Sequence, residues 1–167
     1  LARSTVAAHW IADRQSGTHI MRYASKPVQE ELLPAIARGE LYFCIGMSEP
    51  NSGSDLASIK TKADRVDGGW VINGSKIWTT FAHRSQMMIA LVRTTPKGES
   101  RHAGLSQFII DLSTNGVRIK PIVDHQDEQH FGEIFFDNVF VEDDMLLGVE
   151  GDGWAQVNSE LALERSG

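Results

Sequence analysis

The stretch Met47-Ser48-Glu49-Pro50-Asn51-Ser52-Gly53-Ser54-Asp55 follows directly on an apolar run that begins at Leu41. Such an abrupt change from apolar to small polar residues is typical of a binding loop at the end of a strand. Pro50 has a fixed φ and no backbone donor, and Gly53 can take a positive φ, so the chain can bend sharply and present N–H groups to an anion or a ring. A plain surface turn uses the same residue types, so the loop alone leaves both interpretations open.

A second stretch further along the chain favours the binding-loop interpretation. It reads Ile72-Asn73-Gly74-Ser75-Lys76-Ile77-Trp78-Thr79-Thr80. Asn73-Gly74 is a strong signal for a hairpin turn. Trp78 with Thr79 and Thr80 places a flat apolar ring beside hydroxyl donors, which suits a planar polar heterocycle such as a flavin. A buried sheet tryptophan followed by threonines at a strand end is the structural alternative.

Together the two stretches resemble the acyl-CoA dehydrogenase family. Its middle domain carries a Thr/Ser-Glu-Pro-x-x-Gly-Ser-Asp loop and, further on, an Asn-Gly-x-Lys-x-Trp-x-Thr segment, and their order and separation match this chain. The resemblance implies a mainly β fold, a middle β-barrel domain flanked by helices. We expect residues 1–40 to end an N-terminal helical domain, 41–150 to form the barrel, and 151–167 to begin a truncated C-terminal helical domain, so that the chain is a piece of a longer protein.

Composition excludes some classes of function. Sixteen Lys and Arg against 22 Asp and Glu give a formal net charge of −6, and neither sign forms a long block, which argues against a nucleic-acid partner. No apolar run reaches the length of a membrane span. The single cysteine, Cys44, lies in an apolar run and is interpreted as a core residue in a reducing compartment. A cytoplasmic location is expected, with the mitochondrial matrix as the alternative.

Hydrophobic spacing predicts the elements. We expect a helix near residues 6–14 that Gly17 ends, and a second helix that Ser25 caps, Pro34 breaks or kinks, and Gly39 stops. Many short strands with regular turn signals indicate a barrel or a sandwich. The expected strands span residues 41–47, 58–66, 70–72, 75–79, 86–94, 104–111, 116–123 and 133–141, and a last helix spans 154–165.

The histidines suggest no metal centre. His9 and His19 are ten residues apart, which matches no ligand pattern, so both are interpreted as partly exposed helix and loop residues. The segment 124–131 holds two histidines and three acidic residues in no recognised ligand order, and a solvated loop is expected there. The sequence therefore predicts no metal site.

The resemblance also implies a chemistry, the α,β-dehydrogenation of an acyl-CoA thioester with FAD as hydride acceptor. Carried over residue by residue, Met47 and Ser48 would meet the pyrimidine side of the flavin. Ser54 would lie near the flavin pyrophosphate and the acyl-CoA chain. Trp78 would pack on the isoalloxazine ring, with Thr79 beside it and Thr80 bonding toward N5.

The catalytic base is assigned to Glu164, because a subset of the family places it just before an arginine in the first helix of the third domain. Arg165 would help to hold the CoA or the base region. The alternative base is a glutamate further along the parent protein. The resemblance further implies an electron-transfer flavoprotein as acceptor and a homo-oligomer.

Two other functions are compatible with the sequence. A flavin monooxygenase or oxidase could share the same flavin loop, and a non-catalytic β-barrel interaction module would bind no FAD at all. Weak or absent FAD binding is expected for the 167 residues alone.

Overall fold

The computed structural model describes residues 10–98 and 100–164. Its helices are the π-helix η1 (Ile11–Gly17), α2 (Thr18–Tyr23), α3 (Lys26–Ala37) and α4 (Gly153–Glu164), with 3-10 turns η2 (Leu56–Ser58), η3 (Ala82–Arg84) and η4 (Asp143–Met145). Its strands are β1 (Phe43–Gly46), β2 (Lys62–Val66), β3 (Gly69–Thr80), β4 (Met87–Arg93), β5 (Leu105–Asp111), β6 (Val117–Ile122), β7 (Phe131–Glu142) and β8 (Leu146–Leu147).

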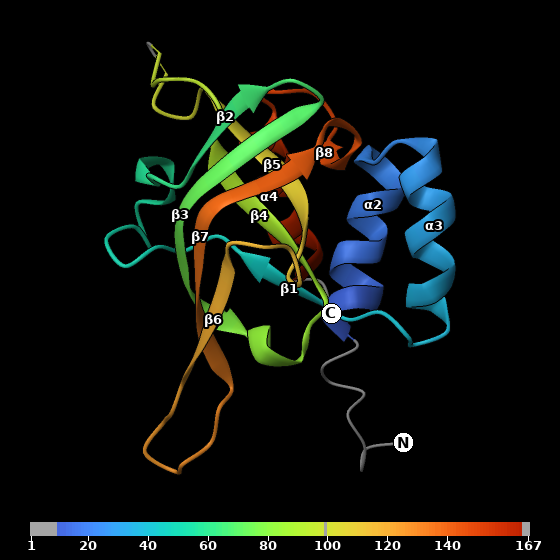
Figure 1. The fold of residues 1–167 in the computed structure, drawn as a ribbon, viewed down its shortest axis with the longest axis vertical. Coiled ribbons are helices and arrows are strands. Elements are labelled where there is room, and N and C mark those ends of the chain that lie inside the picture. The colour runs from blue at the N-terminus through green and yellow to red at the C-terminus, as the bar shows by residue number, and fades with distance from the viewer. Residues whose placement is uncertain (1–9, 99, 165–167) are drawn as a thin grey trace.

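In this part of the chain, eight strands form one mixed sheet in the order β6-β7-β3-β2-β4-β5-β8, with β1 paired in parallel to β4. The sheet curves around a core, α2 and α3 stand side by side against one flank, and α4 lies behind β4 and β5 in the view of Figure 1. The expectation of a mainly β domain with flanking helices is confirmed.

Strand β4 explains how the layers fit together. Its residues alternate between two faces, as a strand requires. Met88, Ala90 and Val92 pack inside the curved sheet, whereas Ile89 packs toward α2 and α3, and Leu91 toward Val157 of α4. Six consecutive residues of this strand are buried, so the prediction of a strand covered on both faces is confirmed.

Two helix-stop predictions were wrong. Gly17 does not end the first helix, because η1 continues directly into α2. A Cβ at Gly17 would lie 3.0 Å from the Ala12 carbonyl oxygen, so the glycine allows close packing at this point. Pro34 does not break α3, which runs on to Ala37. Pro34 is on the exposed side of the helix, where the carbonyl that loses its N–H partner faces water. Gly39, with φ of 71°, does follow the helix end as predicted.

The predicted Asn73-Gly74 turn was also wrong, because both residues lie inside the continuous strand β3. Gly74 has φ of 143°, and the pairing of β3 with β7 shifts register between Ile72 and Gly74. The chain uses the conformational freedom of Gly74 for a β-bulge instead of a turn. The turn that joins β2 to β3 lies at Gly68, which has φ of 73°.

Cys44 is fully buried on β1, and burial raises the pKa of its thiol to about 12. Its interpretation as a core residue is confirmed. None of the described helices has the length and apolar character needed to cross a membrane.

Candidate functional site

Residues of both sequence stretches that carry the resemblance line the cavity at Ser48 and Trp78. It has a volume of about 270 Å³. The loop after β1 and the end of β3 contribute Met47, Ser48, Ile77, Trp78 and Thr80 to its wall. The backbone N–H of Ile77 donates to the Ser48 carbonyl at 2.9 Å, which joins the loop directly to the strand. Ser48 and Trp78 therefore share one cavity.

A buried ion pair holds this loop in place. Lys76 Nζ, on β3, donates to the carbonyl of Met47 at 3.0 Å and to Glu49 Oε1 at 2.9 Å. The Glu49 carboxylate also accepts the backbone N–H groups of Lys60 at 2.6 Å and Thr61 at 2.9 Å. The carboxylate thus binds three donors from two separate segments, and the ammonium fixes the carbonyl of a residue that lines the cavity.

The electrostatics of the pair follow from its burial, since Lys76 is 0% exposed and Glu49 8%. Burial lowers the pKa of Lys76 to about 8, although Glu49 acts to raise it. Burial acts to raise the pKa of Glu49, but the Lys76 charge and the hydrogen bonds of the carboxylate outweigh it, and the net pKa is below its ordinary value. Both groups are therefore charged at neutral pH.

Trp78 has an unusual backbone that presents its ring to solvent. Its φ is 59°, and the pairing with β7 shifts register between Lys76 and Thr79, on either side of it. Trp78 is 59% exposed, and its ring meets Phe131 edge-on, with 6.1 Å between the ring centroids. A left-handed conformation is costly for a bulky residue and is often kept where function requires it. The irregularity turns the tryptophan out of the sheet, so the alternative of a buried sheet tryptophan is wrong.

The other flavin candidates lie at different depths. Thr80 lines the cavity, whereas Thr79 is buried and is not among the lining residues. Ser54 is exposed and also does not line this cavity; it follows the short bridge between Glu49 and Ser52. Their expected contacts with FAD and acyl-CoA remain predictions.

The candidate base lies at the end of the described chain. Glu164 is the last residue of α4, and its side chain is outside the described part of the structure. Arg165 lies wholly outside the described residues, as does His9. The roles assigned to Glu164 and Arg165 stay predictions.

Sequence reasoning missed the helical contribution to the cavity. Ile11 and Gln15 of η1, Ile45 of β1 and Glu160 of α4 complete its lining. A signal for Glu160 was present, because an acidic residue falls among the apolar positions of the last predicted helix. The π-helical geometry of η1, which recurs at functional sites, has no signature in a single sequence.

His19 also differs from its expectation, since it is fully buried rather than partly exposed. Its Nε2 lies 2.6 Å from Gln107 Oε1, and Gln107 Nε2 donates to Glu160 Oε2 at 3.0 Å. A polar row thus connects α2, β5 and α4 beside the cavity.

The segment 124–131 forms the exposed loop between β6 and β7, where Asp124, Glu128 and His130 place one possible ligand atom each within 4.8 Å of one another. Glu128 Oε2 and His130 Nε2 share a hydrogen bond at 2.5 Å, and Asp124 accepts N–H groups of its own turn. The expectation that this loop binds no metal stays a prediction.

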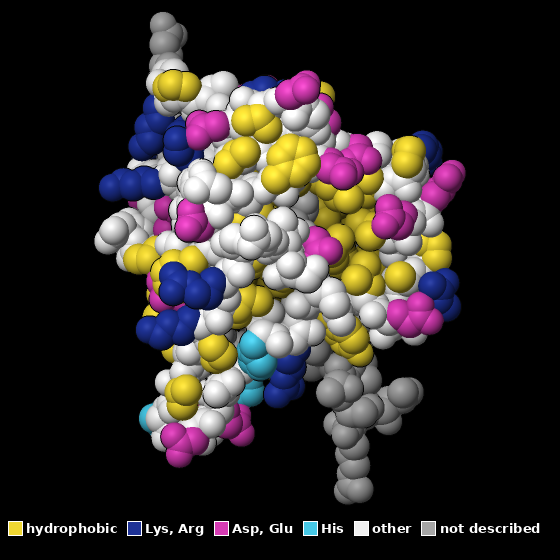
Figure 2. Space-filling view, in the orientation of Figure 1, with side chains coloured by type: hydrophobic (Ala, Val, Ile, Leu, Met, Phe, Trp, Pro, Cys, Tyr) yellow, Lys and Arg dark blue, Asp and Glu magenta, His cyan; other side chains and the backbone are white. Residues whose placement is uncertain are grey.

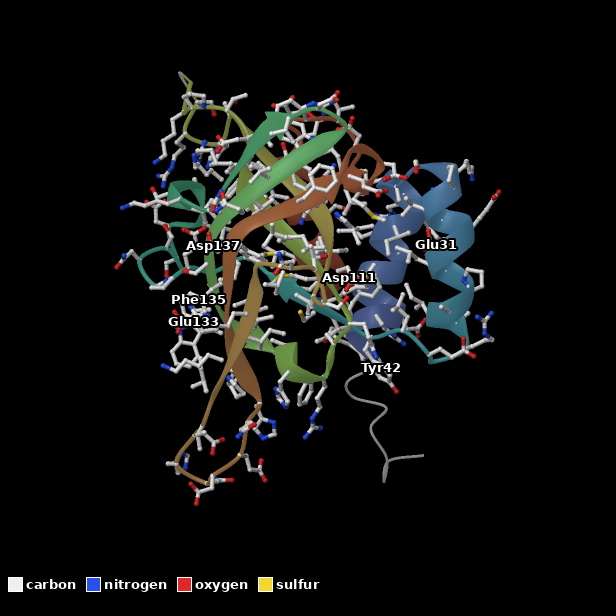
Figure 3. All side chains as sticks on the ribbon, viewed as in Figure 1. Glu31, Tyr42, Asp111, Glu133, Phe135 and Asp137 are labelled. Atoms are coloured by element: carbon white, nitrogen blue, oxygen red, sulfur yellow. The ribbon has the colours of Figure 1, made fainter. Side chains whose placement is uncertain are left out.

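A larger groove of about 610 Å³ separates α3 from the sheet, with Glu31 and Asp111 on its rim. Figure 2 shows apolar side chains gathered between the helices and the sheet, and Figure 3 places Glu31 on α3 across from Asp111 at the end of β5. No residue of the two sequence motifs lines this groove. The cavity at Ser48 and Trp78, which both motifs line, is therefore a better candidate than this groove.

Comparison with known proteins finds related sequences along most of the chain. The family model described as acyl-CoA dehydrogenase, middle domain, matches residues 44–139. Acyl-CoA dehydrogenase FadE34 of Mycobacterium tuberculosis is 42% identical over 146 residues, which cover 87% of this chain and 20% of that protein.

Solved structures show the same fold. The Tcur3481-Tcur3483 steroid ACAD has a TM-score of 0.89 at 29% identity, with 94% of this chain and 40% of that chain covered. The FAD complex of PigA has a TM-score of 0.84 at 26% identity, with 96% and 41% covered. The chain thus spans well under half of the length of each of these relatives.

Proposed function

The chain belongs to the acyl-CoA dehydrogenase family, and from that premise we propose that it forms one wall of the FAD and acyl-CoA site of an enzyme that dehydrogenates an acyl-CoA thioester. The observation that carries the proposal is the common cavity of Met47, Ser48, Trp78 and Thr80. These residues come from the two stretches on which the family resemblance rests.

The residues of the cavity suit an isoalloxazine ring, which has apolar faces and polar edges. The exposed indole of Trp78 supplies a flat apolar surface, and the hydroxyls of Ser48 and Thr80 supply donors beside it. One of the structural relatives is an FAD complex, which supports the same cofactor here. When bound, FAD would supply the hydride acceptor for the reaction.

The chain's own residues would orient the cofactor and move the proton. Lys76 and Glu49 hold the loop backbone at Met47, so the polar groups of the loop need no rearrangement on binding. Ser54 would contact the flavin pyrophosphate and the acyl-CoA chain, and Thr79 would contact the flavin beside Trp78.

We assign the abstraction of the α-proton to Glu164, with Arg165 holding the CoA or the base region. Glu164 is one helical turn after Glu160, which lines the cavity, so the base would enter from the same helix. A carboxylate placed beside an apolar acyl group is a suitable base because desolvation raises its pKa toward neutrality.

The proposal extends to the whole protein. Because the chain spans 20% to 41% of the relatives described above, we propose that residues 1–40 and 151–167 belong to helical domains that continue beyond it. The whole protein would be a homo-oligomer that passes electrons to an electron-transfer flavoprotein.

The test is reduction of the flavin in the full-length protein. Purified protein is loaded with FAD and mixed with straight, branched and steroid-derived acyl-CoAs, and flavin absorbance is followed with an artificial electron acceptor. Bleaching with formation of a 2-enoyl-CoA is expected for at least one substrate. Absence of bleaching with every substrate rejects the dehydrogenase, whereas oxygen uptake with peroxide or a hydroxylated product indicates an oxidase or monooxygenase. Failure to bind FAD favours an interaction module.

A further inference from the structure

The peptide group that joins Met47 to Ser48 lies between a buried charge and the cavity. Its carbonyl oxygen accepts a hydrogen bond from Lys76 Nζ at 3.0 Å, and both Met47 and Ser48 line the cavity. The described part of the chain has no cis peptide bond, so the carbonyl and the N–H of this group point in opposite directions. The Ser48 N–H therefore points away from the Lys76 ammonium.

The Ser48 N–H has no acceptor among the described residues. The Ser48 carbonyl is used, because it accepts the N–H of Ile77 at 2.9 Å, but the Ser48 N–H donates to no atom within residues 10–98 and 100–164. A backbone donor in a protein normally finds a partner, in the chain, in water or in a ligand. This N–H is therefore available to a molecule that the cavity binds.

A charged donor on one side of a peptide group strengthens the N–H on its other side. A hydrogen bond to the carbonyl oxygen polarises the whole group, and its N–H becomes a stronger donor. An ionised donor has a larger effect than a neutral one. Lys76 is ionised at neutral pH, because its pKa, which burial lowers to about 8 against the opposing effect of Glu49, is still above 7.

Lys76 also lies where water cannot screen its charge. It is 0% exposed, and the next two residues of β3, Ile77 and Trp78, line the cavity. Glu49 offsets part of the charge, but the ammonium is the partner that bonds to the Met47 carbonyl. The described residues that line the cavity include no lysine or arginine, so the buried ammonium behind the wall is the cation best placed to act on a ligand there.

We propose that Lys76 is a positioning residue that acts through the peptide group between Met47 and Ser48 and makes the site bind reduced FAD more tightly than oxidised FAD. The inference rests on the proposed function, in which Ser48 meets the pyrimidine side of the flavin. Reduction at neutral pH adds two electrons and one proton, so the pyrimidine ring gains a negative charge. The strengthened N–H of Ser48, directed into the cavity, stabilises that charge.

The experiment compares the dissociation constants of oxidised and reduced FAD for the full-length protein at neutral pH. Oxidised FAD is titrated directly. The constant for reduced FAD follows from the reduction potential of the bound flavin, measured without oxygen, with dithionite as the reductant and a reference dye. The oxidised constant should exceed the reduced one at least about tenfold, which places the potential of the bound flavin about 30 mV above that of free FAD.

A double variant connects this ratio to Lys76. Lys76→Met combined with Glu49→Gln removes both charges, so neither is left buried and unpaired, and the new amide oxygen can still accept the N–H groups of Lys60 and Thr61. The ratio should fall at least about fivefold. Lys62→Met removes a half-exposed lysine of the neighbouring strand β2 and should leave the ratio unchanged.

The ratio separates this role from a merely structural one. If Lys76 only stabilised the loop, the double variant would bind both forms of FAD more weakly by the same factor, and the ratio would stay as in the wild type. Melting temperatures show whether each variant is folded. Lys76→Gln combined with Glu49→Gln takes the place of the first double variant if that one does not fold, with the same expected fall.

The outcomes also separate the inference from the proposed function. A wild-type ratio of about one or less, or an unchanged ratio in a folded double variant, overturns the inference; flavin bleaching by an acyl-CoA would still support the dehydrogenase. If the full-length wild type binds no FAD, the proposed function is rejected and the inference falls with it.

Discussion

Lys76 is the residue on which the local structure of the cavity depends most. A fully buried ammonium is costly unless it is paired and hydrogen-bonded, and this one bonds to both the Glu49 carboxylate and the Met47 carbonyl. Glu49 in turn fixes the backbone at Lys60 and Thr61. The pair therefore specifies the loop conformation more than it adds to the free energy of folding.

Removing one partner should be strongly destabilising. Lys76→Met leaves the Glu49 carboxylate buried without its counter-charge, and we expect the free energy of unfolding to fall by about 3 to 5 kcal/mol. Urea denaturation followed by circular dichroism measures it. Lys62→Met is the matched control, because its ion pair with Asp64 is 56% exposed on each side and should contribute less than about 1 kcal/mol. Equal losses in the two variants would contradict this account.

The same pair predicts an acid transition. The folded-state pKa of Glu49 is below its ordinary value, so its contribution to stability is complete above that ordinary value, about 4.5, and is lost as pH falls through the lowered pKa. The urea midpoint of the wild type should therefore fall between about pH 5 and about pH 3. The urea midpoint of Glu49→Gln should be lower than that of the wild type at neutral pH and should fall less over the same pH range. A Glu49→Gln curve parallel to the wild type would show that another carboxylate controls the transition.

At the scale of elements, strand β3 combines a packed strand with a binding surface. Its register with β7 shifts twice, at Gly74 and around Trp78. The first shift accommodates the close approach of Thr61, and the second turns the Trp78 ring toward the cavity. A regular strand of the same length would have placed alternate residues on fixed faces and could not have exposed this ring beside Ser48.

Gly74→Ala tests the first shift. An added Cβ would lie 2.6 Å from both Cα and Oγ1 of Thr61, at a φ of 143° that other residues rarely adopt. We expect the free energy of unfolding to fall by about 2 to 4 kcal/mol, measured by urea denaturation. Gly53→Ala is the control, since its Cβ would meet open space. A Gly74→Ala variant as stable as the wild type would mean that the bulge is not constrained as described.

These elements also show what could be predicted from sequence. The loop at Met47 and the Trp78 segment were predicted to be partners because together they resemble the two motifs of the acyl-CoA dehydrogenase family, and the structure brings them to one cavity. Strand β4 was predicted from its unbroken apolar run. The bulge at Gly74 was not predicted, because an Asn-Gly pair indicates a positive φ but is compatible with either a turn or a bulge. The burial of His19, Gln107 and Glu160 depends on how two helices dock on β5, and that information is not local.

At the scale of the whole molecule, the cavity lies where three parts of the chain meet. Strand β3 and the loop after β1 contribute the motif residues, η1 contributes Ile11 and Gln15, and α4 contributes Glu160. Docking of the helices on the sheet therefore shapes the site, and a change at the β5 surface can alter it without touching the motifs.

The 167-residue chain by itself should bind FAD weakly, because under the proposed function the site would also be formed by further helical domains and a neighbouring subunit. We expect no binding tighter than about micromolar by calorimetry, whereas the full-length protein should bind at least about a hundredfold more tightly. Sub-micromolar affinity for the isolated chain would show that these residues form a complete cofactor site.

The central claim is that the loop at Ser48 and the strand end at Trp78 form one wall of a flavin site. The most direct measurement is a titration of the full-length protein with FAD, in the wild type, in Trp78→Ala and in Phe140→Ala, an exposed aromatic that does not line the cavity. Trp78→Ala should raise the dissociation constant at least about tenfold while Phe140→Ala leaves it unchanged. Wild-type affinity in Trp78→Ala would contradict the account.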